Sequence, residues 1–169
     1  MSKHNPRTLD VLIDTPRGSR NKYKFDKKLG GFRLAGVLAV GHSFPYDFGS
    51  VPGTKGGDGD AIDVLVLMDE PAFVGCYVKC RLVGGIRADQ TEDDGRVERN
   101  DRLLAVAHKS IEYASVEQIT DLTDELVTQI EHFFVSYNET KGRKFEPKGR
   151  FDANDAAKIV EQSRKLRNR

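Results

Sequence analysis

The sequence has little of what marks several large classes of protein. Its 169 residues contain no tryptophan, only two cysteines, and no apolar run near the roughly 20 residues that a membrane-spanning helix needs. The segment Met1–Asp10 lacks the apolar region of a signal peptide. A net charge of +1 gives no general attraction to nucleic acid or to an anionic membrane. We therefore expect a cytoplasmic protein that binds neither nucleic acid nor membranes.

The two cysteines, Cys76 and Cys80, lie four residues apart in a segment with a strand-like pattern. Alternation along a strand would place both on the same face. Neither has a second cysteine or a histidine at the spacing of a zinc site. The pair therefore indicates reduced, buried thiols and not a disulfide framework.

The rest of the composition is ordinary for a globular chain, with 38% hydrophobic and 31% charged residues, and its length fits one domain over residues 1–169. Alternating and short apolar patterns in the first two-thirds are typical of strands. The predicted strands are Leu9–Asp14, Lys22–Asp26, Phe32–Val40, Ile62–Met68, Val74–Ile86 and Arg102–Ala107. The continuous apolar run Ile62–Met68 predicts burial on both faces, Gly84-Gly85 a kink, and Asp94-Gly95 a hairpin tip.

The last third has a helical period instead. Leu126, Ile130 and Tyr137 follow that spacing, Thr123 is a good N-cap, and Gly142 ends the helix. A second helix is predicted from Asp152 to the C-terminus. Strands followed by helices predict an α+β fold, namely a small closed β-barrel (OB-like, with about five main strands) and C-terminal helices packed outside it.

The most informative segment is Gly56–Leu67, which holds three carboxylates within six residues: Asp58, Asp60 and Asp63. An aspartate at the entrance of a buried strand is costly unless it is paired or bound to a metal, and clustered carboxylates favour a hard divalent cation such as Mg²⁺. The alternative is that Asp and Gly merely form a turn. The pattern excludes an EF-hand, because a strand follows where a helix is required, and it also lacks the spacing of a Walker loop.

The segment Asp58–Leu67 resembles the Asp-x-Asp-x-x-Asp signature of the soluble inorganic pyrophosphatases, with Ala61 where proline is frequent. Three further segments are similar to that family: Ile13–Tyr23, Phe44–Gly49 and His132–Tyr137. The resemblance therefore covers most of the chain.

The resemblance implies hydrolysis of pyrophosphate to two phosphates with several Mg²⁺ ions, Mn²⁺ being an alternative metal. By position, Asp58 and Asp63 would be metal ligands, and Asp60 would accept the proton of the attacking water. Lys22 and Tyr137 would bind phosphate oxygens of this small-molecule substrate. Family members are commonly oligomers, so self-association is expected.

Several positions depart from the family pattern. Asp14 stands where glutamate is usual and would contact a metal through water, whereas Lys24 reverses the charge of a usual glutamate. Gly36 replaces a phosphate-gripping arginine, and Phe44 and Phe48 replace tyrosines. We still place Lys24 and Phe48 among the predicted substrate-binding residues.

Further departures lie near the acidic hairpin. In the most natural register Asn100 stands at a metal-ligand position and Arg102 at that of a phosphate-binding lysine, whereas a one-residue shift would offer Asp101 as the ligand. Asp89 or Glu92 is expected to supply a further metal ligand.

Basic residues close to these positions in the sequence are candidate replacements for the missing phosphate-binding cations. They are Arg20, Lys24, Arg33, Arg99, Lys141, Arg143 and Lys144. The run from 141 to 144 fits a solvated helix terminus equally well. Two alternative functions stay open: the same metal chemistry on another phosphorylated small molecule, and a non-catalytic binding module.

Overall fold

Five strands of the main sheet form a closed ring. The computed structural model describes residues 5–167, and the strands follow one another around the ring in the order β1–β4–β5–β8–β6, with β6 pairing back to β1. Two more strands, β7 and β9, pair with the far part of β6. The bounds are β1 Thr8–Thr15, β4 Asp47–Ser50, β5 Asp63–Leu67, β6 Tyr77–Thr91, β7 Val97–Arg99, β8 Arg102–Ala107 and β9 Lys144–Asp152. The predicted barrel of an α+β fold is confirmed.

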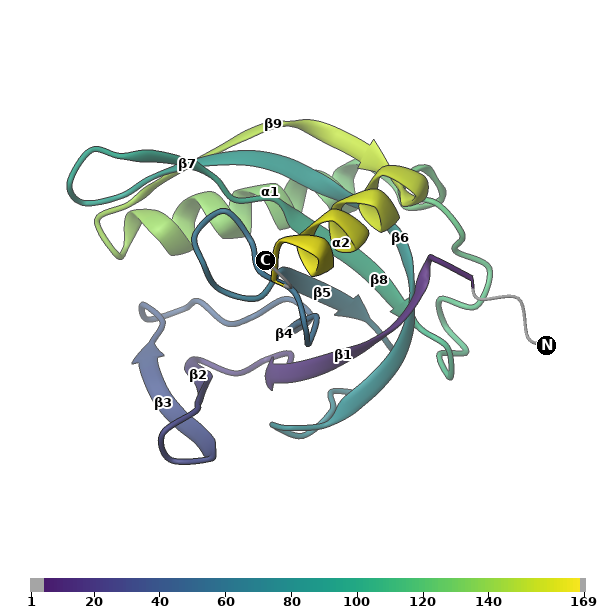
Figure 1. Cartoon of the computed structure of the whole chain (residues 1–169), viewed down its shortest axis with the longest axis horizontal. Helices are drawn as coiled ribbons and strands as arrows, with labels where there is room; N and C mark the ends of the chain where they lie inside the picture. Colours follow the sequence, from purple (N-terminus) through teal and green to yellow (C-terminus); the bar gives the residue numbers. More distant parts are fainter. Residues whose placement is uncertain (1–4, 168–169) are drawn as a thin grey trace.

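A separate hairpin of β2 (Asn21–Asp26) and β3 (Gly31–Val37) projects from the barrel, at the lower left of Figure 1. The helical elements are η1 (Ile119–Asp121), α1 (Asp124–Glu139) and α2 (Ala153–Arg167). Helices α1 and α2 lie outside the barrel, as predicted (Figure 1). Among the described residues, no helix is long and apolar enough to cross a membrane.

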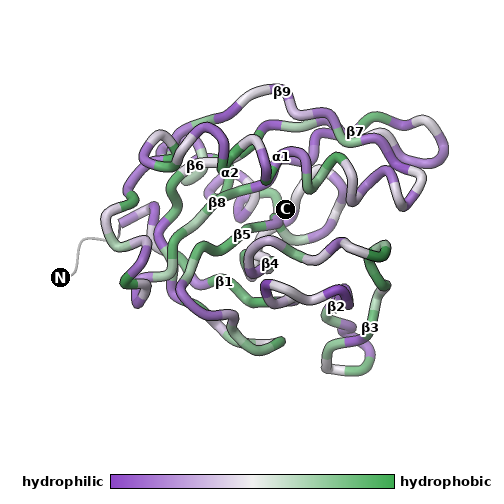
Figure 2. The backbone as a smooth tube through the Cα atoms, turned by 180° about the vertical axis from the view of Figure 1, so that it is seen from behind, coloured by the Kyte–Doolittle hydropathy of each residue, from purple (hydrophilic) through white to green (hydrophobic). Residues whose placement is uncertain are grey.

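Strand β5 is the centre of the barrel wall. Its apolar residues Val64–Leu67 are all buried, and it pairs with β4 on one side and, in parallel, with β8 on the other. Strands β5 and β8 appear mostly green, hence hydrophobic, in Figure 2. A continuous apolar run suits this position because both faces of the strand are covered, which confirms the prediction.

Strand β6 is irregular at the predicted glycine pair. The register against β8 shifts between Leu82 and Gly84, and Gly84 has φ +149°. A Cβ on Gly84 would lie 2.5 Å from the carbonyl oxygen of Phe151, and one on Gly85 would lie 2.3 Å from the ring of Phe151. Only glycine allows β9 to approach this closely. The glycine pair therefore lets β6 form part of the barrel and also pair with β7 and β9.

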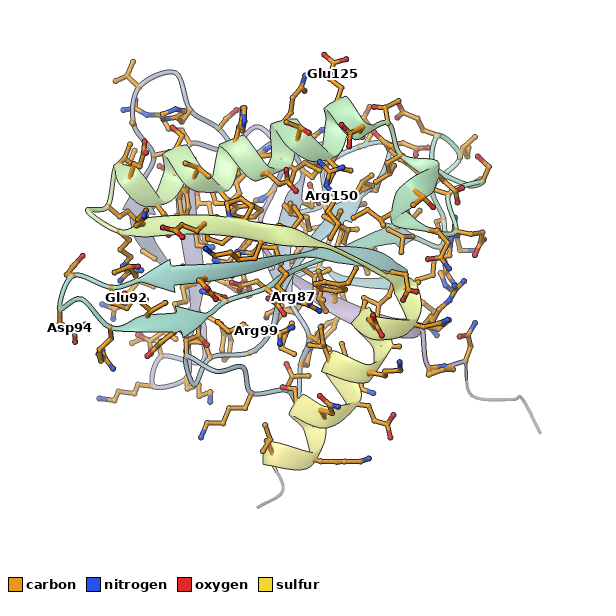
Figure 3. The ribbon with its side chains drawn as sticks, turned by 90° about the horizontal axis from the view of Figure 1, so that it is seen from above. Arg87, Glu92, Asp94, Arg99, Glu125 and Arg150 are labelled. Atoms are coloured by element: carbon orange, nitrogen blue, oxygen red, sulfur yellow. The ribbon has the colours of Figure 1, made fainter. Side chains whose placement is uncertain are left out.

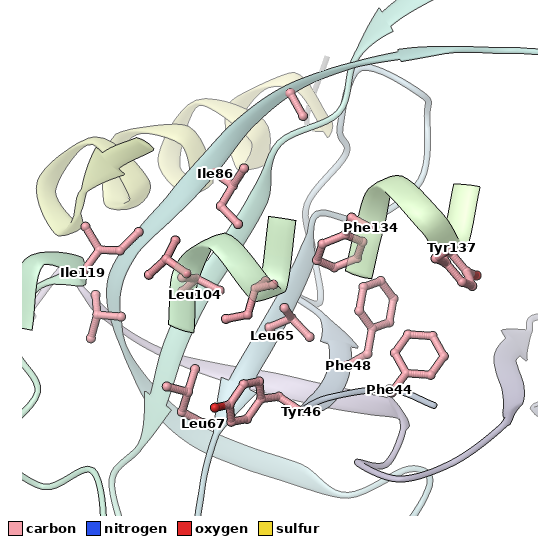
Figure 4. Packing of buried hydrophobic residues seen from close by; sticks show 14 of the residues in the cluster. Phe44, Tyr46, Phe48, Leu65, Leu67, Ile86, Leu104, Ile119, Phe134 and Tyr137 are labelled. Atoms are coloured by element: carbon pink, nitrogen blue, oxygen red, sulfur yellow. The ribbon is translucent and has the colours of Figure 1, made fainter. Parts of the chain in front are cut away.

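Two hydrophobic clusters cover the two sides of the sheet. One lies under α1 and includes Phe44, Phe48, Phe134 and Tyr137, which Figure 4 shows near one another at one end of the cluster. The other lies under α2 and includes Ala156 and other residues of that helix. Both clusters use residues from the central strands β5, β6 and β8, which fixes the two helices relative to the sheet.

Helix α1 begins as the sequence predicts, since the Thr123 hydroxyl accepts a hydrogen bond from the backbone N–H of Leu126 at 3.2 Å. Its last helical residue is Glu139, and Gly142 has φ +74°, a left-handed conformation that turns the chain back. The sequence did not predict the strand that follows, β9. Pro147 and Gly149 mask its alternation, whereas pairing with β6 and burial of Phe145 stabilise it.

The cysteine prediction is partly wrong. Both thiols are free, and Cys80 is buried in β6, where burial raises the pKa of its thiol to about 12. Cys76 precedes the strand and is only half-buried. The alternation of a strand therefore does not extend back to it.

Candidate active site

The aspartate loop is shaped by backbone hydrogen bonds and by one contact with α2. Gly56 N–H donates to the Asp60 carbonyl at 2.6 Å, and Gly59, with φ +85°, donates to the Gly56 carbonyl at 3.0 Å. The Ser163 hydroxyl of α2 accepts from Lys55 N–H at 2.7 Å and donates to the Lys55 carbonyl at 2.6 Å. The C-terminal helix thus holds the loop in place.

Within the loop, Asp58 accepts the backbone N–H of Asp60 at 3.0 Å, and Asp63 opens β5. Burial raises the pKa of Asp58, and the neighbouring carboxylates Asp63 and Asp60 raise it further. Asp14, near the end of β1, belongs to the same group. Burial raises the pKa of Asp14 to about 6, with Lys22 opposing the shift and Asp63 adding to it. Carboxylates that raise one another's pKa values favour a nearby cation.

One such cation belongs to the chain itself. Arg102 is 5% exposed, and its Nη1 donates to Asp63 Oδ2 at 2.6 Å and to Asn100 Oδ1. Its guanidinium lies 5.1 Å from the ring centroid of Phe134 and 5.4 Å from that of Phe145. Arg102, a predicted phosphate ligand, therefore neutralises one of the predicted metal ligands.

The polar network continues from Asn100 into the hairpin. Asn100 Nδ2 donates to Gln90 Oε1 at 3.0 Å, Gln90 Nε2 donates to Glu92 Oε1 at 2.6 Å, and Arg143 pairs with Glu92 at 3.0 Å. Gln90, 4% exposed, was missed in the sequence. Its neighbour Asp89 was a predicted metal ligand, but alternation along β6 puts the side chains of residues 89 and 90 on opposite faces.

The structure places Asp89 and Asp101 beside basic residues. Asp89 faces the register position of Arg99 across the β6–β7 pair. The hydrogen bond to Glu146 raises the pKa of Lys148, and the charge of Asp89 adds to that shift. Asp101 accepts from Ala88 N–H at 3.2 Å and from Arg99 at 2.9 Å. Figure 3 shows Arg99 on this part of the sheet, with Glu92 nearer the hairpin tip. Asp89 is thus not brought together with the aspartate loop.

A cavity of about 340 Å³ gathers several predicted ligands. Asp58, Asp63, Asn100 and Asp101 all line it, and α2 forms the opposite wall. The two metal-ligand registers left open by the sequence, Asn100 and Asp101, thus both reach this cavity.

The ammonium group of Lys22 packs against two aromatic rings. Its Nζ is 3.7 Å from the ring centroid of Phe48 and 5.2 Å from that of Phe44, which are 5% and 1% exposed. Burial lowers the pKa of Lys22 to about 8, Asp63 and Asp14 raise it, and Lys141 lowers it further. The ring of Phe48 therefore packs against Lys22, and this buried ring is covered by the lysine side chain.

The remaining predicted residues lie around this lysine. Lys24 Nζ pairs with Asp60 Oδ2 at 3.0 Å, and both side chains are exposed. The hydroxyl of Tyr137 accepts a hydrogen bond from Lys141, and burial raises the pKa of Tyr137 to about 12, so it stays a neutral donor. Acidic and basic groups thus form two adjoining regions, as a metal–phosphate substrate would require.

Comparison with known proteins was made on sequence and on structure. The family described as inorganic pyrophosphatase matches residues 11–168 of this chain. The chain belongs to the inorganic pyrophosphatase family. It is 36% identical over 158 residues to an inorganic pyrophosphatase of a Nostoc species, covering 94% of this chain and 90% of that protein. It is 37% identical over 154 residues to one from Leifsonia xyli, covering 90% and 91%.

Solved structures agree with this membership. The crystal structure of the inorganic pyrophosphatase from Thermus thermophilus has a TM-score of 0.89 at 27% identity, covering 99% of this chain and 95% of the other. That from Helicobacter pylori has a TM-score of 0.88 at 30% identity, covering 99% and 97%. Family membership is thus established.

Proposed function

We propose that this pyrophosphatase-family member hydrolyses inorganic pyrophosphate to two phosphates with the help of divalent metal ions, Mg²⁺ in particular. The observation that carries the proposal is the meeting of two groups at one site. Asp14, Asp58 and Asp63 form an acidic region, and Lys22 with Tyr137 forms a phosphate-binding region beside it. A metal–pyrophosphate complex presents the complementary charges.

The acidic region fits a hard divalent cation. Burial and mutual repulsion raise the pKa values of Asp14 and Asp58, so a cation between them and Asp63 would relieve both costs. Within residues 5–167, no three Asp, Glu, His or Cys side chains are arranged to enclose a metal. An ion held here would therefore keep several waters, which is the habit of Mg²⁺. Bound, it would lower the pKa of a water and neutralise phosphate charge.

The region around Asn100 fits a cation less well. Asn100, Gln90 and Arg102 bring two neutral amides and a positive charge. We therefore assign the metal to Asp58 and to Asp63, a carboxylate whose Oδ2 also accepts from Arg102, with Asp14 contacting the metal through water. Asp101 and Glu92 each have a basic partner, Arg99 and Arg143, so a role for either as a ligand stays a prediction.

Asp60 is the proposed acceptor of the proton of the attacking water. Its carboxylate is exposed, and one oxygen pairs with Lys24. Lys24 thereby places a positive charge at the point where the water would lose its proton. Lys22, raised on the rings of Phe44 and Phe48, and the Tyr137 hydroxyl would hold phosphate oxygens in line with that water.

The alternative of a larger phosphorylated substrate has weak support. It depended on space left by the arginine missing at Gly36 and by the two missing tyrosine hydroxyls. Phe44 and Phe48 are buried against Lys22. The absence of their hydroxyls therefore makes the surface under Lys22 apolar, but it does not enlarge the substrate site. A non-catalytic module would not need the acidic cluster, in which burial raises the pKa of Asp58 and the neighbouring carboxylates raise it further.

The test is phosphate release from pyrophosphate with and without Mg²⁺ and Mn²⁺. Asp60→Asn is expected to lower kcat by about 10²–10⁴-fold, the usual contribution of general base catalysis. Asp93→Asn, an exposed hairpin carboxylate, is the matched control and should leave kcat unchanged. No metal-dependent release by the unmodified protein would refute the function. Self-association and a cytoplasmic location stay predictions, to be checked by light scattering and cell fractionation.

A further inference from the structure

Seven basic residues lie near the site in the sequence, and the structure separates one of them from the other six. In six of them the cationic group already bonds to an acceptor of the protein. Five of these pair with carboxylates, and one guanidinium donates to a backbone carbonyl. The pairs are Lys24–Asp60, Arg33–Asp26, Arg99–Asp101, Arg143–Glu92, Lys144–Glu146 and Arg20 with the carbonyl of Leu38. Lys141 is the exception.

Among the described residues, the polar contact of the Lys141 ammonium is a neutral one. Its Nζ donates to the Tyr137 hydroxyl and lies 4.1 Å from the centroid of that ring. No carboxylate of the described chain forms an ion pair with it. A lysine held on a phenol in this way has two of its three N–H donors left for an anion.

The local fold explains how Lys141 reaches this place. It lies four residues beyond Tyr137, just after the end of α1, where the chain makes a tight turn with Lys141 N–H donating to the Asn138 carbonyl at 2.9 Å. The side chain of Asn138 points inward, is 2% exposed and donates to the carbonyl of Phe134 at 2.8 Å. The turn therefore presents Lys141, and not the residue next to Tyr137, to the site.

The cations around Lys141 repel it. Burial of the ammonium lowers the pKa of Lys141, and Arg143, Arg102 and Lys24 lower it further. Lys22 is affected in return, since Lys141 lowers its pKa too. Positive groups that converge without an equal number of carboxylates stabilise a bound anion, and the phenol beside them adds a hydrogen-bond donor.

We propose that Lys141 is a phosphate-binding residue of this protein, which donates to an oxygen of the phosphate group that Lys22 and the Tyr137 hydroxyl also contact. The inference rests on the proposed function for the identity of the substrate, pyrophosphate, and its product, inorganic phosphate. It assigns one of the phosphate contacts to a residue in the turn after α1. Asn138, the residue after Tyr137, has a structural role instead, through its buried hydrogen bond to the Phe134 carbonyl.

The experiment measures binding of inorganic phosphate, with Mg²⁺ present, by titration calorimetry. Lys141→Met keeps the apolar stem against Tyr137 and removes the charge, and it should weaken phosphate binding about tenfold or more. Lys141→Arg should recover most of that loss. The matched control is Lys144→Met, from the same basic run but paired with Glu146 and exposed, which should bind phosphate as the unmodified protein does.

Steady-state hydrolysis of pyrophosphate separates binding from stability. Lys141→Met should raise KM about tenfold and change the melting temperature by no more than the control. Phosphate binding equal to that of the unmodified protein, or an equal loss in Lys144→Met, would overturn the inference. So would a failure of the unmodified protein to bind phosphate. If the unmodified protein released no phosphate from pyrophosphate while Lys141→Met still weakened phosphate binding, the proposed function would fail and the anion site would stand.

Discussion

The ion pair between Arg102 and Asp63 makes a quantitative prediction about stability without metal. The Arg102 side chain is 6% exposed and that of Asp63 is 25% exposed, and their atoms are 2.6 Å apart. Removing one partner of a fully buried pair costs about 3–5 kcal/mol because the other charge is left uncompensated. Water reaches Asp63 in part, so for Arg102→Met we expect a loss of about 2–3 kcal/mol in the free energy of unfolding.

Methionine is the informative replacement because it keeps an unbranched apolar stem. The packing against Phe134 and Phe145 is then largely retained, and the measured loss reports the charge. The assay is urea unfolding in EDTA at fixed protein concentration, since self-association would otherwise shift the midpoint. For a chain of this size each kcal/mol lowers the melting temperature by about 2–4 °C, so a drop of about 4–12 °C is expected.

The control is Arg96→Met, which breaks the exposed ion pair with Asp94 and should leave the free energy of unfolding nearly unchanged, because water screens both charges. Adding Mg²⁺ should stabilise Arg102→Met more than the unmodified protein, because a cation can then serve Asp63 in place of the guanidinium. A loss no larger than that of the control, or equal stabilisation of both proteins by Mg²⁺, would refute this account of the Arg102–Asp63 pair.

Two further predictions concern affinity and pH. A Cβ on Gly36 would have no heavy atom within 4 Å, and Gly36 pairs with Lys22 across the hairpin. Gly36→Arg should therefore lower KM for pyrophosphate about tenfold, as measured by steady-state phosphate release. The control Gly31→Arg, at the end of the hairpin, should leave KM unchanged. Burial raises the pKa of Asp14 from 3.8 to about 6, so its protonated form favours folding, and this contribution disappears as pH rises through 6. Asp14→Asn should therefore be more stable than the unmodified protein by about 1–2 kcal/mol at pH 7.5 in EDTA, a gain that urea titrations should find shrinking towards pH 4.

Elements with a strong local pattern were predictable. The apolar run of β5 and the Thr123 cap of α1 lie where the sequence places them, because hydrophobic periodicity and capping act within a few residues. Strand β9 was missed because Pro147 and Gly149 weaken its pattern and its stabilising partner, β6, lies far away in the sequence. Short β4, whose residues pack tightly on β1, was missed for the same reason.

The same division holds within the site. A cluster of carboxylates within six residues is visible in a sequence, so Asp58, Asp60 and Asp63 were predicted as a metal-binding motif. The pairing of Arg102 with Asp63 joins residues 39 positions apart, and the contact of Asn100 with Gln90 crosses a hairpin. Sheet register decides both, and register is a property of several strands together.

The sequence by itself determined the acidic motif, the barrel with its outer helices and the resemblance to the pyrophosphatases, because each depends on residue types at short spacing. Only the tertiary structure decided which charges neutralise one another. It placed the guanidinium of Arg102 on Asp63 and left the ammonium of Lys141 on the Tyr137 hydroxyl. Electrostatic energy depends on distance and burial in space, and a list of charged residues contains neither.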